Sequence, residues 1–131
     1  MPYEARIQQQ ITFMERQTQI ILETIGDVIL FDIKGDVTAL SEPFLNAAYK
    51  KANDQGLSKI ILKFRKDAYI NSGGIALLIQ MLAETKKNDQ KTAIAGLSDH
   101  FKKIFNMVDI TKFAKIYDTV EEALKQMSGG A

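Results

Sequence analysis

The sequence predicts an α/β domain with a mixed, mostly parallel sheet and about four helices packed on it. Two β-rich runs come first along the chain, and short apolar runs then alternate with segments whose apolar residues recur at helical spacing. Such an alternation builds parallel strands joined by helical crossovers. The length of 131 residues, with 46% apolar and 25% charged side chains, is typical of a single globular domain.

The sheet is predicted to begin with a hairpin formed by residues 18–25 and 28–34. Gly26 and Asp27 separate the two runs, and glycine at the first loop position suits a tight hairpin turn. The next predicted strand is apolar on both faces, as in a buried central strand. This strand and the two that follow it are predicted at residues 60–64, 91–97 and 113–117.

The first two predicted helices have clear boundaries. One begins at Ser41, whose hydroxyl is a capping group and which is followed by Pro43 in the first turn, and it ends at Gly56. The other runs from Gly74 to about Lys86 and is apolar over most of its surface. This second helix must therefore be heavily covered.

The last two predicted helices also begin with capping residues. The third is capped by Ser98 or Asp99 and is amphipathic. The fourth is short and follows Thr119, which forms a capping box with Glu122. The apolar face of the third helix consists of Phe101, Ile104, Phe105 and Val108.

The composition excludes several classes of protein. The chain has no cysteine, which excludes a disulfide framework, a thiolate metal site and a cysteine nucleophile, and which fits a reducing compartment. Its 17 basic and 16 acidic side chains leave a net charge of +1, which argues against a nucleic-acid binder. No secretory signal opens the sequence, and no apolar stretch approaches the roughly 20 residues of a spanning helix. We therefore expect a cytoplasmic protein with no nucleic-acid partner and no membrane insertion.

Residues suited to catalysis or metal binding are scarce. The single histidine, His100, has no second histidine or cysteine near it in the sequence, and there is no glycine-rich nucleotide fingerprint. Asp32, Asp36 and Glu42 lie at a strand end, a turn and a helix start, where acidic residues are common without a metal. We expect no catalytic residue, no cofactor and no metal site, and hence no enzyme.

The most informative segment joins an apolar strand run to an apolar helix and consists of Asn71, Ser72, Gly73 and Gly74. A helix N-terminus leaves backbone N–H groups unpaired and carries the positive end of the helix dipole, so a phosphate on Ser72 fits there. A second interpretation needs no modification, because asparagine and serine are favoured N-caps and paired glycines ease a tight turn. The residues by themselves leave both interpretations open.

Four phrases, in their order along the chain, resemble the STAS domain, the family of bacterial anti-sigma factor antagonists. They lie at residues 35–38, 71–78, 96–98 and 113–124. The resemblance implies a STAS-like domain over residues 18–127. An N-terminal extension over residues 1–17 would precede this domain, and a flexible tail over residues 128–131 would follow it.

The family members that this chain resembles work by partner switching. The unphosphorylated domain binds an anti-sigma factor that is also a serine kinase, phosphorylation releases it, and a serine phosphatase restores binding. The family's phosphoacceptor corresponds here to Ser72, with Asn71 in the place of an aspartate. The contact surface that the resemblance implies comprises Asn71, Ser72, Gly73, Gly74, Asp36 and Ser41.

Several alternatives remain open. One branch of the family contains domains that are phosphorylated poorly or act as scaffolds in large signalling assemblies, and another branch supports membrane transporters or lipid-export ATPases. In a non-phosphorylated scaffold or adaptor of either kind, Ser72 would be only a cap. In the N-terminal extension, Ile7, Ile11 and Met14 allow an amphipathic helix, whereas the neighbouring glutamines and β-branched residues allow an added strand. Pairing of two copies into a homodimer through this extension is open as well.

Overall fold

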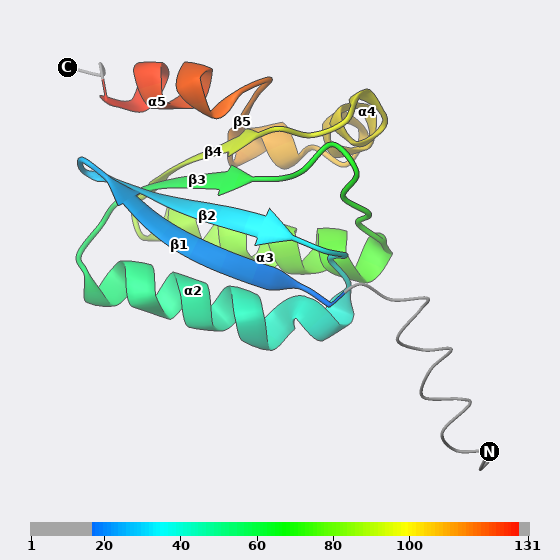
Figure 1. Cartoon of the computed structure of the whole chain (residues 1–131), viewed down its shortest axis with the longest axis horizontal. Coiled ribbons are helices and arrows are strands. Elements are labelled where there is room, and N and C mark those ends of the chain that lie inside the picture. Colours follow the sequence, from blue (N-terminus) through cyan, green and yellow to red (C-terminus); the bar gives the residue numbers. More distant parts are fainter. Residues whose placement is uncertain (1–16, 129–131) are drawn as a thin grey trace, which may run out of the picture.

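The computed structural model describes residues 17–128, which form a five-stranded mixed sheet (Figure 1). The strands follow one another across the sheet in chain order, the first pair antiparallel and each later pair parallel. This confirms the predicted α/β class with a mostly parallel sheet. The strands are β1 (Gln19–Ile25), β2 (Val28–Lys34), β3 (Lys59–Lys63), β4 (Lys91–Ala95) and β5 (Lys115–Tyr117).

The hairpin between β1 and β2 has the predicted two-residue turn. Ile25 pairs with Val28, so that only Gly26 and Asp27 lie between the strands. Gly26 has a φ of 60°, in the left-handed region that glycine adopts without steric penalty. The predicted hairpin and its turn are therefore confirmed.

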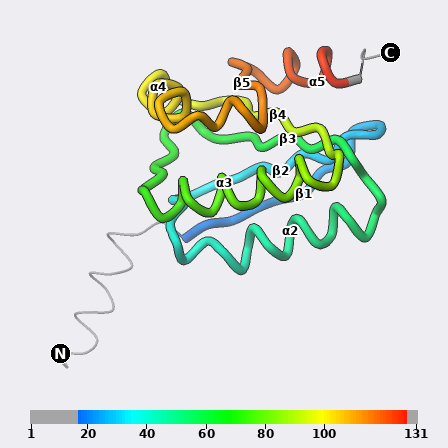
Figure 2. The backbone as a smooth tube through the Cα atoms, turned by 180° about the vertical axis from the view of Figure 1, so that it is seen from behind, coloured from blue at the N-terminus to red at the C-terminus, as the bar shows by residue number. Residues whose placement is uncertain are grey.

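The four α-helices of residues 17–128 cover the sheet unequally. Three of them pack on one face, and only the last packs on the other, as Figures 1 and 2 show for α5 against α2 and α3. None of the helices within residues 17–128 is long and apolar enough to cross a membrane. The α-helices are α2 (Glu42–Asp54), α3 (Ser72–Lys87), α4 (Asp99–Met107) and α5 (Val120–Ser128), and two short 3-10 helices are η1 (Ala39–Ser41) and η2 (Ile110–Lys112).

The sheet separates two apolar cores. Alternation along β2 places Ile29 and Phe31 in the larger core beneath α2, α3 and α4, whereas Val28 and Leu30 face α5. The expected heavy covering of α3 is confirmed at Leu78, which is fully buried in the larger core. This arrangement fixes the positions of the loops that leave the carboxyl ends of β2 and β3.

Three details near the C-terminal half differ from the sequence predictions, and the first is that β4 ends at Ala95 rather than at residue 97. β5 begins at Lys115 rather than at residue 113, because the N–H groups of Phe113 and Ala114 still donate to the Ile110 carbonyl, at 2.9 and 3.2 Å, and so continue the η2 turn. Val108, predicted on the apolar face of α4, follows the end of the helix and is 40% exposed. The expectations for residues 1–16 and 129–131 lie outside the described residues.

Candidate functional site

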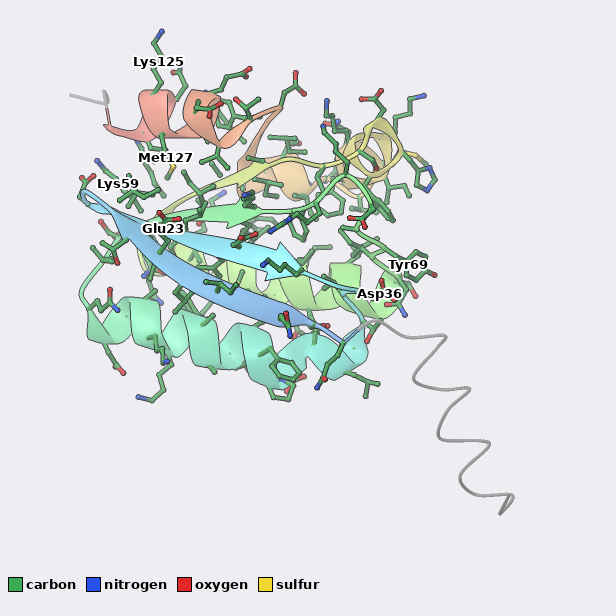
Figure 3. All side chains as sticks on the ribbon, viewed as in Figure 1. Glu23, Asp36, Lys59, Tyr69, Lys125 and Met127 are labelled. Atoms are coloured by element: carbon green, nitrogen blue, oxygen red, sulfur yellow. The ribbon has the colours of Figure 1, made fainter. Side chains whose placement is uncertain are left out.

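Two loops meet at the carboxyl edge of the sheet and form the candidate site. One is the turn of residues 36–41, between β2 and α2, which we call the 36–41 turn; the other leads from β3 into α3. The Val37 N–H donates to the Tyr69 carbonyl at 2.9 Å, and the Asn71 N–H donates to the Val37 carbonyl at 3.1 Å. These bonds make a parallel bridge between Val37 and Ile70. Figure 3 shows Asp36 and Tyr69 at this end of the molecule.

Asn71 is the N-cap of α3, and Ser72 is the first residue of the helix. The Asn71 Oδ1 atom accepts from the Gly74 N–H at 2.9 Å, and the Asn71 carbonyl accepts from the Ile75 N–H at 2.9 Å. The helix therefore begins two residues before the predicted start at Gly74. Ser72 is exposed, and no residue within 17–128 forms a hydrogen bond with its hydroxyl. The capping role belongs to Asn71, which leaves the hydroxyl of Ser72 available.

Gly73 and Gly74 allow α3 to approach the 36–41 turn closely. A Cβ atom on Gly74 would lie 2.1 Å from the Val37 carbonyl oxygen, and one on Gly73 would lie 3.0 Å from the Ala39 nitrogen. Neither glycine is among the residues with positive φ. Their small size is needed for packing between backbones, rather than for the tight turn that the sequence suggested.

Ser41 lies inside the molecule, which corrects its predicted place on the contact surface. It is fully buried, and its Oγ atom accepts from the Thr38 N–H at 3.0 Å and lies 2.5 Å from the Thr18 hydroxyl. It also makes no side-chain capping bond to α2, contrary to the sequence prediction, because these internal bonds occupy its hydroxyl. Thr18 in turn donates to the Asp36 carbonyl at 2.6 Å. Ser41 thus supports the 36–41 turn from within, while half-buried Asp36 remains partly at the surface.

Two large apolar side chains lie in the same two loops and were missed by the sequence reasoning. Leu40, in η1, is 70% exposed, and Tyr69, just before the Asn71 cap, is 55% exposed. The Tyr69 ring makes an edge contact with Phe101 of α4, at 6.5 Å between ring centroids. The sequence held one sign of them: both are apolar residues in segments between the predicted strands and helices, where no helical or strand periodicity accounts for an apolar side chain.

Two ion pairs outside these two loops have carboxylates with a shifted pKa. A hydrogen bond from Lys102 lowers the pKa of Asp118 below its ordinary value of 3.8 and raises the pKa of Lys102 above 10.5. A hydrogen bond from Lys59, at 2.7 Å, likewise lowers the pKa of Asp27. In the part of the chain that the structure describes, no three histidine, aspartate or glutamate side chains form a group that could hold a metal ion.

An α/β sheet with three helices on one face and one on the other, bearing an exposed serine at a helix start, defines the class of this domain. The chain belongs to the STAS domain family, whose model matches residues 19–123. The fold is therefore that of a STAS domain, as the sequence predicted.

Solved structures of anti-sigma factor antagonists share this fold. A putative antagonist from Thermotoga maritima matches with 16% identity over 82% of this chain and 92% of that chain, with a TM-score of 0.69. An antagonist from Mycobacterium paratuberculosis matches with 14% identity over 83% and 92% of the respective chains, with a TM-score of 0.69. The phosphorylated form of the Bacillus cell fate determinant SpoIIAA matches with 20% identity over 83% and 99%, with a TM-score of 0.63.

Proposed function

We propose that this chain is a cytoplasmic, non-enzymatic anti-sigma factor antagonist that acts by partner switching. In its unphosphorylated form it binds an anti-sigma factor that is also a serine kinase, phosphorylation of Ser72 releases that partner, and a serine phosphatase restores binding. The proposal rests on the Ser72 hydroxyl, which is exposed at the first position of the 16-residue helix α3 because Asn71 supplies the cap. The shared fold with antagonists, one of them solved in a phosphorylated form, supports it.

The surface around Ser72 suits a partner that binds by apolar contact. Leu40 and Tyr69 are exposed on the two loops that the Val37–Ile70 bridge joins, so both side chains are available to a docking protein. A phosphate on Ser72 adds about −1.5 to −2 charges at pH 7. A partner covering this surface would have to desolvate those charges, and it would therefore dissociate.

The chain itself tolerates the phosphate. Asn71 takes up the Gly74 N–H, but the N–H groups of Ser72 and Gly73 belong to the first turn, where a helix has no acceptor of its own for them. These groups and the helix dipole favour a phosphate at this position. Phosphorylation thus changes the charge of the surface without requiring a change of fold.

The test uses a serine-kinase anti-sigma factor encoded in the same genome, incubated with the full chain and ATP. We expect mass spectrometry to locate one phosphate on Ser72. Ser72→Ala should remain bound in the presence of ATP, and Ser72→Asp should bind at least about tenfold more weakly, or 1.4 kcal/mol. Ser58→Asp, at another exposed serine, is the matched control and should bind the partner as tightly as the unphosphorylated wild-type chain does. Undiminished binding by Ser72→Asp would refute the switch.

One observation favours the alternative of a scaffold or adaptor that is not phosphorylated. Asn71 keeps the capping bond of an aspartate but carries no charge that a kinase could recognise. In this alternative the surface of Leu40 and Tyr69 would hold a permanent partner. If the kinase phosphorylated the Asn71→Asp variant but not the wild-type chain under the same conditions, the adaptor would be favoured over the switch.

A further inference from the structure

An apolar groove runs between the edge strand β1 and helix α2, on the side of the molecule that no described element covers. Its volume is about 500 Å³. Phe44, at one end of the groove, is 38% exposed although it is a large apolar residue. The groove, which we call the β1–α2 groove, is lined chiefly by Ile20, Leu22, Pro43, Phe44, Ala47 and Lys51.

The chain enters the described structure at the end of this groove where α2 begins. Thr18 is only 6% exposed, and its hydroxyl bonds to the Asp36 carbonyl and lies beside Ser41, the residue before α2. From this point β1 and α2 run in the same direction, because β1 pairs with β2 from Gln19 against Lys34 and α2 follows the end of β2. A preceding segment that reverses direction at Thr18 would therefore run along the groove.

The preceding sequence has an apolar face of matching length. Ile7, Ile11 and Met14 are spaced as on one face of a helix and span seven positions. Phe44 and Lys51 are also seven positions apart on α2, so at 1.5 Å per residue each span is about 10 Å.

The same segment also fits the distance to Thr18. Residues 15–17 remain for the reversal, which is within the usual length of a helix-to-strand connection.

We propose that residues 4–14 form a helix that folds back into the β1–α2 groove, with Met14 toward Phe44 and Ile7 toward Lys51. The tether makes the chain's own segment the favoured occupant, because a short linker gives an effective concentration of the order of millimolar without the cost of association. A strand added to the outer edge of β1 would leave the α2 side of the groove uncovered.

Paramagnetic relaxation in the full chain tests the proposal. Because the chain has no cysteine, Gln10→Cys introduces one unique site for a nitroxide label. In the ¹⁵N-labelled, spin-labelled chain we expect loss of amide intensity at Leu22, Phe44 and Ala47, and none at Ala83 on α3. A second sample mixes spin-labelled chain that lacks ¹⁵N with ¹⁵N-labelled chain that carries no nitroxide. We expect no loss of amide intensity in this mixed sample.

A pair of matched variants checks that the groove is responsible. Ala47 and Ala83 are both exposed alanines, on α2 and α3 respectively. Ala47→Asp should abolish the intensity loss, Ala83→Asp should preserve it, and unchanged amide shifts elsewhere would show that both variants fold. Loss that occurs only in the mixed sample would assign the groove to a second copy and overturn the proposal. Loss confined to β1, with α2 unaffected, would assign the segment to an added strand and overturn it as well.

Discussion

Asn71 supplies the cap of α3, although the neighbouring Ser72 is also a residue type that caps helices well. The asparagine side chain accepts the Gly74 N–H, and the serine hydroxyl is left exposed beside it. Capping and modification therefore do not compete for one oxygen atom. A phosphate can be added to Ser72 without breaking the bond that starts α3.

Removing the cap should destabilise the domain. Asn71→Ala loses the bond to the Gly74 N–H and should lower the free energy of unfolding by about 1 kcal/mol. Asn71→Asp keeps an acceptor at the same position and adds a charge that the helix dipole favours, so its stability should be equal or higher. Urea denaturation of both variants measures the difference. Equal losses for alanine and aspartate would contradict the assignment of Asn71 as the cap.

The two glycines should differ in their tolerance of a methyl group. Gly74→Ala places a Cβ against the Val37 backbone and should destabilise the domain by about 1–3 kcal/mol. Gly73→Ala meets Ala39 at 3.0 Å and needs a smaller adjustment, so it serves as the matched control. Thermal unfolding of the two variants gives the comparison. If Gly73→Ala were the more damaging, the close approach at Gly74 would not be the reason for the glycine pair.

At this scale the sequence predicted which segment matters but not the role of each residue in it. Asn71 and Ser72 are both good caps, and the choice depends on backbone angles that the residue types do not reveal. Ser41 has the residue type and spacing of a helix cap, but Thr18 and Thr38 occupy its hydroxyl. Such contacts depend on the tertiary fold.

At the scale of elements, the 36–41 turn is supported from two sides. Ser41 and Thr18 hold it from the interior, and the Val37–Ile70 bridge ties it to the loop before α3. Leu40 is thereby presented at the surface on a turn whose backbone is bonded at both ends. The order of strands and helices was predictable from their periods, whereas this bridge joins loops that carry no period.

Ser41→Ala should loosen this turn. The variant leaves the partly buried Thr38 N–H without its acceptor, which should lower the free energy of unfolding by about 1 kcal/mol. Amide hydrogen exchange at Val37 and Asn71 should also become faster, because both N–H groups take part in the bridge. Ser58→Ala, at an exposed serine, should change neither measurement. Normal exchange at Val37 in Ser41→Ala would show that the turn does not depend on Ser41.

At the scale of the whole molecule, exposed ion pairs connect distant parts of the fold. Lys59 of β3 pairs with Asp27 in the hairpin turn, and Lys102 of α4 pairs with Asp118 after β5. Both carboxylates have a pKa below the ordinary value of 3.8 in the folded protein. Their charged forms therefore stabilise the fold above that pH, and the contribution is lost as the pH falls through the lowered pKa values.

Acid should destabilise the wild type more than variants without these carboxylates. The difference between the urea denaturation midpoints at pH 7 and pH 3 should be larger for the wild type than for Asp27→Asn or Asp118→Asn. The difference should shrink in 1 M salt, where the Debye length is only about 3 Å. A pH dependence identical in the wild type and both variants would show that the pairs do not contribute.

The Val37–Ile70 bridge has a consequence for synthesis as well as for binding. All of α2 and β3 lie between its two halves in the chain. A nascent chain that has left the ribosome only as far as β3 contains the 36–41 turn but not the segment that completes the proposed docking surface. A partner that needs Leu40 and Tyr69 together would therefore not respond to a chain that ends before the loop between β3 and α3.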